Sequence, residues 1–142
     1  MNNQSYLTAF TTQVLNLATE LKDMYPDEND FKTSHTAVIL MKKTNPRLLH
    51  NIIMEKLTFY RDQIFAEDDK FFANRIAELE EAKDESANPS ETKQSYIENK
   101  AEDDKFNLII RVRTYWNEMS EKTKKNIWMY LKVLFRLSDR LN

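Results

Sequence analysis

The chain has 142 residues, of which 41% are apolar and 31% charged, and its formal net charge is −2. It contains neither glycine nor cysteine. Without glycine, the P-loop, the dinucleotide-binding turn, the nucleophile elbow and the EF-hand loop are excluded, because each needs a residue free to adopt positive φ or to approach a ligand closely. Without cysteine, disulfides, thiol nucleophiles and zinc ribbons are excluded. The length suits a single domain, residues 1–142.

The first predicted helix runs from about Ser5, its N-cap, to Met24. Tyr25-Pro26 ends it, because the residue before proline avoids the α region. Its apolar positions alternate at three and four residues, which is the spacing of a helix seam: Leu7, Phe10, Val14, Leu17, Leu21 and Met24. We interpret this seam as an internal contact of the fold, with a homodimer interface as the alternative.

Two further helices are predicted before residue 66. A short one covers Phe31–Lys43. A longer one runs from Pro46 to about Phe65, because Asn45 is a good N-cap and proline suits the first helical position. Its apolar residues recur every three or four positions, which predicts one buried face.

The middle of the chain is acidic. The run Glu67-Asp68-Asp69 places negative charge in the first turn of a fourth helix, where the helix dipole favours it. No large apolar residue occurs between Glu80 and Ser95, and Asn88-Pro89 lies within that stretch. The sequence therefore predicts a mobile acidic loop at about residues 82–100.

Helical structure is predicted to resume near Glu102. Ser120 is expected to cap a last helix over about Glu121–Leu141. The longest apolar runs, Ala37–Met41 and Ile127–Leu131, are too short to span a membrane. The predicted fold is all-α, with about six helices in an antiparallel bundle. An intracellular location without membrane contact is expected.

Charge is divided unevenly along the chain. Residues 66–105 carry thirteen acidic and six basic residues, whereas residues 106–142 carry three acidic and eight basic ones. In the last helix, basic residues fall within about 80° of one another at 100° per residue: Lys122, Lys125, Lys132, Arg136 and Arg140. We predict Lys125, Lys132, Arg136 and Arg140 as partner-binding residues. The acidic partner is either residues 66–105 of this chain or another molecule.

Few residues suggest catalysis. His35 and His50 are isolated, and a metal site needs more ligands that converge. Two pairs, Glu78/Glu81 and Glu118/Glu121, have the spacing that places two carboxylates on one helical face for Mg²⁺. The first pair lies at the edge of a charge run, and the second straddles the predicted helix break at Ser120. No catalytic residue, metal or cofactor is therefore predicted.

Two segments resemble a known group of proteins. These are Phe59–Phe72, FYRDQIFAEDDKFF, and Tyr115–Leu137, YWNEMSEKTKKNIWMYLKVLFRL. Together they resemble small helical proteins encoded by large nucleocytoplasmic DNA viruses. The resemblance implies a non-enzymatic viral protein associated with the virion. The matching positions form a hydrophobic pattern, so the resemblance assigns no functional residue.

The sequence leaves three functions open. The favoured one is a non-enzymatic helical binding or structural module with a protein partner. The first alternative is an accessory protein that binds nucleic acid through the basic stripe of the last helix. The second alternative is a small all-α metal-dependent hydrolase that uses one of the glutamate pairs.

Overall fold

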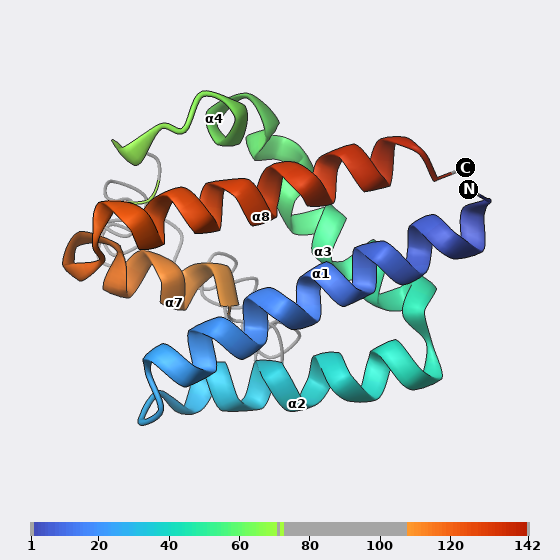
Figure 1. The fold of residues 1–142 in the computed structure, drawn as a ribbon, viewed down its shortest axis with the longest axis horizontal. Helices are drawn as coiled ribbons and strands as arrows, with labels where there is room; N and C mark the ends of the chain where they lie inside the picture. Colours follow the sequence, from blue (N-terminus) through green and yellow to red (C-terminus); the bar gives the residue numbers. More distant parts are fainter. Residues whose placement is uncertain (1, 71, 73–107, 142) are drawn as a thin grey trace, which may run out of the picture.

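The computed structural model describes residues 2–70, 72 and 108–141, and every regular element within them is helical (Figure 1). The α-helices are α1 (Asn3–Met24), α2 (Asn29–Thr44), α3 (Pro46–Leu57), α4 (Arg61–Phe65), α7 (Leu108–Tyr115) and α8 (Glu121–Asp139). Short 3-10 helices, η1 (Thr58–Tyr60) and η3 (Trp116–Glu118), follow α3 and α7. The predicted all-α fold is confirmed. The loop predicted at 82–100 and the Glu78/Glu81 pair lie outside the described residues.

Helix α1 packs between α2 and α8 (Figure 1). It begins earlier than predicted, because Asn2 rather than Ser5 is the N-cap: the Asn2 side chain accepts a hydrogen bond from the Ser5 N–H at 2.9 Å. The predicted seam is buried within the single chain from Leu7 to Leu21, whereas Met24 at its end is exposed. The seam thus supplies the α1 part of the hydrophobic core.

The predicted helix over 46–65 is interrupted in the structure. Helix α3 ends at Leu57, and the 3-10 turn η1 separates it from α4. The hydroxyl of Thr58 donates a hydrogen bond to the carbonyl of Met54 at 2.5 Å. The same kind of bond, from Thr19 to the Leu15 carbonyl, occurs inside the uninterrupted α1, so this hydroxyl does not by itself end the helix. The continuous-helix prediction was wrong, because packing of α4 against α8, where the Phe65 and Phe135 ring centroids lie 5.8 Å apart, overrides the local periodicity.

A residue with positive φ follows the end of α4, although the chain has no glycine. Glu67 has φ 51°. Its N–H donates to the Ile64 carbonyl at 3.1 Å, and the Asp68 N–H donates to the Gln63 carbonyl at 3.0 Å. These are the two bonds of a Schellman motif, whose left-handed position glycine usually occupies because it has no Cβ. A glutamate fills that position here.

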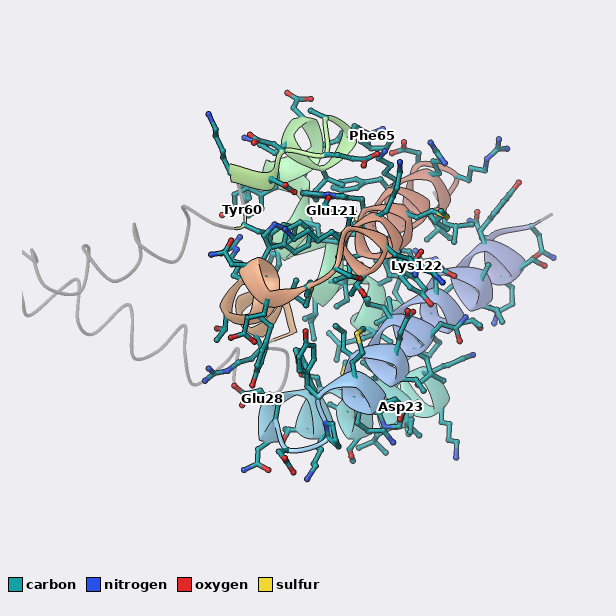
Figure 2. The ribbon with its side chains drawn as sticks, turned by 60° about the vertical axis from the view of Figure 1, so that its left-hand side comes forward. Asp23, Glu28, Tyr60, Phe65, Glu121 and Lys122 are labelled. Carbon is teal, nitrogen blue, oxygen red and sulfur yellow. The ribbon has the colours of Figure 1, made fainter. Side chains whose placement is uncertain are left out.

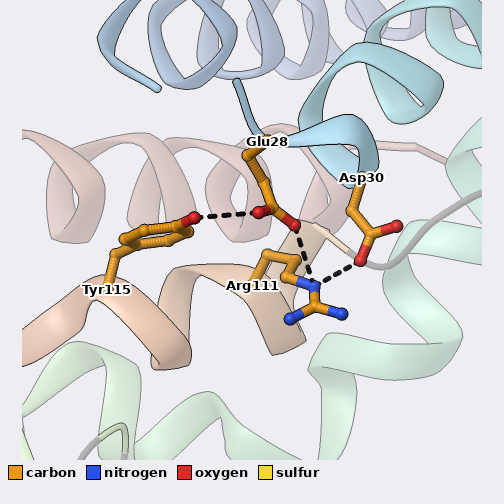
Figure 3. Close-up of polar contacts among 4 residues, drawn as sticks. All are labelled: Glu28, Asp30, Arg111 and Tyr115. Carbon is orange, nitrogen blue, oxygen red and sulfur yellow. Dashed lines mark hydrogen bonds and ion pairs between the residues drawn. The ribbon is translucent and has the colours of Figure 1, made fainter. Parts of the chain in front are cut away.

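Helix α7 is joined to the start of α2 by a polar cluster (Figure 3). The Arg111 guanidinium pairs with the carboxylate of Glu28 at 3.1 Å and also with that of Asp30. The Tyr115 hydroxyl donates a hydrogen bond to Glu28 at 2.8 Å, and its ring stacks on Tyr25 with centroids 4.2 Å apart. Charge and ring contacts therefore fix α7 against the turn between α1 and α2.

Aromatic residues fill the core where η3 meets α8. Trp116 stacks on Phe72 with ring centroids 4.4 Å apart, and Trp128 meets the two rings at 5.2 and 5.0 Å. All three side chains are buried. Such pairs add to the stabilisation that comes from burying their area. Trp128 is thus a core residue, as its spacing predicts.

Candidate functional site

Helix α8 has one buried apolar face and one exposed face. Ser120 caps it as predicted, because the Ser120 Oγ accepts a hydrogen bond from the Thr123 N–H at 3.1 Å. Five apolar side chains are buried: Ile127, Trp128, Leu131, Leu134 and Phe135. No helix in the described part of the chain combines the length and the apolar character that a membrane span requires.

The exposed side of α8 is basic. We call four of its exposed residues the basic face: Lys122, Lys125, Arg136 and Arg140. Lys122 projects from the first turn (Figure 2). The Arg136 guanidinium lies 5.8 Å from the Phe65 ring centre, and that of Arg140 lies 5.8 Å from the ring centre of Tyr6. Within residues 2–70, 72 and 108–141, no carboxylate forms an ion pair with these four side chains.

Lys132, also predicted as a binding residue, has a different environment. Its ammonium pairs with the carboxylate of Glu67, and only 19% of its side chain is exposed. Glu67 belongs to the acidic segment 66–105, so that segment supplies the partner of this one lysine. The structure therefore places Lys125, Arg136 and Arg140 on open surface and separates Lys132 from them.

A carboxylate near the end of the basic face is neutralised from α4. Arg61 donates two hydrogen bonds to Asp139, at 3.1 and 2.7 Å. The hydrogen bond from Arg61 is the main reason that the pKa of Asp139 lies below its usual value. The guanidinium also lies 5.2 Å from the ring centre of Phe135. Asp139 is thus compensated locally and does not cancel the charge of Arg140.

An open groove of about 370 Å³ runs between α1 and α8, beside the basic face. Seven of the described residues line this α1–α8 groove: Gln13, Asn16, Glu20, Asn126, Met129, Tyr130 and Val133. The amides supply hydrogen-bond donors and acceptors. Met129, 59% exposed, and Val133 supply apolar surface. The groove therefore offers a partner both apolar contact and side-chain hydrogen-bonding groups.

Glu20 and Tyr130 meet inside the groove, one from each wall. Burial is the main cause that raises the pKa of Tyr130 to about 12, and a hydrogen bond to the Glu20 carboxylate raises it further. The hydroxyl therefore remains neutral well into the alkaline range. Among the described residues that line the groove, Glu20 is the only acidic one.

Each of the two histidines contacts a neighbouring helix. His50 Nε2 lies 2.9 Å from the Ser138 Oγ, and the ring meets Phe10 edge to face at 4.7 Å. His35 Nε2 lies 3.1 Å from the Thr19 Oγ1, which links α2 to α1. Both rings are thus held by neighbouring helices.

The described acidic residues do not form a metal site. Glu118 lies in η3 and Glu121 in the first turn of α8, so this pair straddles a helix break, as predicted. No group of three or more histidine, aspartate or glutamate side chains converges among the described residues. The part of the chain that the structure describes thus offers no observation that favours the hydrolase alternative.

The α1–α8 groove and Met129 were not identified from the sequence. Gln13, Asn16 and Glu20 recur at three and four residues, which marks a second, polar stripe beside the apolar seam of α1. Met129 is an apolar residue within the basic stripe of α8. The polar stripe of α1 and the apolar Met129 are both visible in the sequence. Only the contact between α1 and α8 places them on opposite walls of one groove.

Comparison with known proteins gives no likeness from which to transfer a function. No protein-family model matches the chain. No curated protein and no solved structure matches it either. The functional argument therefore depends on the geometry of the basic face and the α1–α8 groove.

Proposed function

We propose that this protein is a non-enzymatic helical binding module that engages an acidic partner protein through the basic face of α8. One observation carries the proposal: four basic side chains share an exposed helix face, and no carboxylate of the described residues pairs with them. Exposed charges of one sign steer association and select partners. Following the resemblance to viral helical proteins, we further propose that the partner is a virion component.

An acidic protein suits this face better than a nucleic acid does. A carboxylate adjoins the first base, because the exposed Glu121 precedes Lys122. A phosphate backbone carries charge at a regular spacing and would have to pass this carboxylate. An acidic polypeptide can place its charges only opposite the bases. The amide-lined groove beside the face also matches the hydrogen-bonding groups of a polypeptide.

Charge reversal tests the proposal. The variant carries glutamate at all four positions of the basic face, and binding of a fluorescent polyglutamate peptide is measured by anisotropy at low salt. The matched control reverses four other exposed bases: Lys32, Lys43, Arg47 and Lys70. Both variants have the same net charge. We expect roughly tenfold or greater loss of affinity for the first variant and a clearly smaller loss for the control.

A mixed-sequence DNA duplex is the second probe. If the duplex binds, the polyglutamate peptide does not, and affinity falls steeply as salt rises, the nucleic-acid alternative replaces the proposal. If the two charge-reversal variants lose affinity for polyglutamate equally, net charge rather than the basic face determines binding. That result would overturn the proposal, as would the absence of any binding by the unmodified protein at low salt.

A further inference from the structure

We infer that the α1–α8 groove is the docking site for an acidic amphipathic helix of the partner protein. The apolar side chains of that helix lie beside Met129 and Val133, and its carboxylates face the basic face of α8. This inference rests on the proposed function. It adds the form of the partner and the place on this protein where the partner binds.

The spacing of the groove residues suits a third helix. On α8, Met129 and Val133 are four residues apart, and on α1, Gln13, Asn16 and Glu20 are three and four apart. Each wall therefore presents one helical ridge, and the space between two ridges accepts side chains that recur at the same spacing on another helix. Each wall spans seven residue steps, from 13 to 20 on α1 and from 126 to 133 on α8, which correspond to about 10 Å, or two turns, of the bound helix.

The charges of the two walls differ, and this difference selects an acidic helix. On the α8 side, the groove is lined between Asn126 and Val133, and the basic face continues beyond it at both ends, to Lys122 and to Arg140. On the α1 side, Gln13 and Asn16 are neutral, and Glu20 is the one acidic side chain among the described lining residues, opposite Tyr130 of α8. A helix with carboxylates on one flank and neutral residues on the other is complementary to both walls.

Met129 supplies the apolar anchor. Its side chain is 59% exposed, although it lies on a helix whose other large apolar residues are largely withdrawn from solvent. An unbranched thioether adapts to varied apolar partners, which is why methionine is common on helix-binding surfaces. Burying Met129 under the docked helix removes this exposed apolar area from water.

The test uses two synthetic peptides of identical composition. One places leucines at positions i, i+3 and i+4 with glutamates along one flank of a helix, and the other is a scrambled version without amphipathic order. Binding is measured by anisotropy with the unmodified protein, with Asn16→Trp, which fills the groove, and with Met129→Ser. The matched control is Thr12→Trp, because Thr12 is exposed one turn away on α1 and does not line the groove. Thermal unfolding checks that each variant is folded.

We expect the amphipathic peptide to bind the unmodified protein roughly tenfold tighter than the scrambled peptide does. This difference in affinity should disappear in Asn16→Trp and become smaller in Met129→Ser. It should be unchanged in Thr12→Trp. Equal binding of the two peptides would overturn the groove inference. So would unchanged binding in Asn16→Trp. In either case, sensitivity to charge reversal on the basic face would still support the proposed function. Loss of that sensitivity would instead overturn both.

Discussion

The carboxylate of Glu67 pairs with the ammonium of Lys132, which lies 65 residues further along the chain. Glu67 has positive φ and lies two residues after the end of α4, while Lys132 lies in the middle of α8. The pair therefore connects the most unusual backbone position of the described residues with the helix that carries the basic face. It also gives a physical reason for a glutamate where glycine is usual, because only a residue with a side chain can reach α8.

The variant Glu67→Gly separates the steric cost of positive φ at this position from the contribution of the ion pair with Lys132. In the Lys132→Ala background, where no pair exists, glycine should raise the free energy of unfolding by about 1 kcal/mol, because it adopts positive φ without a steric penalty. In the unmodified protein, loss of the ion pair offsets much of that gain, so the net change is smaller. Denaturant unfolding of the four proteins measures this. An equal gain in both backgrounds would mean that the pair contributes nothing.

Truncation of two adjacent residues of α8 should change stability by very different amounts. Trp128→Ala should lower the free energy of unfolding by about 3–5 kcal/mol, because the side chain is buried against Phe72 and Trp116. Met129→Ala should change it by less than about 0.5 kcal/mol, because Met129 is exposed. Chemical denaturation of both variants is the measurement. Similar losses would contradict the orientation of α8.

Tyr130 should titrate late. Its pKa of about 12 exceeds the unfolded value of 10.0, so its contribution to stability is complete below pH 10 and is lost as pH rises toward 12. Ultraviolet titration of tyrosinate should show a late step near pH 12 that Tyr130→Phe removes. Glu20→Gln should lower that pKa, while burial keeps it above 10. A late step that persists in Tyr130→Phe would refute the assignment.

His35 should resist protonation. Burial, and after it the charge of Lys22, lowers its pKa below the unfolded value of 6.5, while Asp23 opposes the shift. The contribution of neutral His35 to stability is therefore present above pH 6.5 and is lost as pH falls through the folded pKa. An NMR titration of the ring protons, assigned with His35→Gln, measures this. Lys22→Gln should raise the pKa. An unchanged pKa would show that Lys22 does not act on it.

The side chain of Asn45 should stabilise the protein as the N-cap of α3. The Asn45 side-chain oxygen accepts a hydrogen bond from the Leu48 N–H at 3.2 Å and caps α3. Asn45→Ala should lower the free energy of unfolding by about 1 kcal/mol. The same change at Asn16, an exposed position inside α1, should be neutral or slightly stabilising, because alanine favours helix interiors. Equal losses at the two positions would argue against a capping role.

Features that depend on neighbouring residues could be predicted from the sequence. The caps at Asn45 and Ser120 and the burial of Trp128 follow from local hydrogen bonding and helical periodicity, which the order of residues displays directly. The all-α class follows in the same way. Periodicity also predicts that bases share one face of α8, because their angular positions depend only on their spacing.

Only the tertiary structure decided which of those bases stay open to a partner. Lys132 and Arg136 have similar positions on the helix, yet Lys132 pairs with Glu67 because the break after Leu57 brings α4 against α8. The break accompanies the packing of α4 against α8, which the local periodicity of residues 46–65 does not register. The α1–α8 groove likewise requires two distant helices to lie side by side. Sequence spacing defines each wall, but contacts between distant segments determine the space between them.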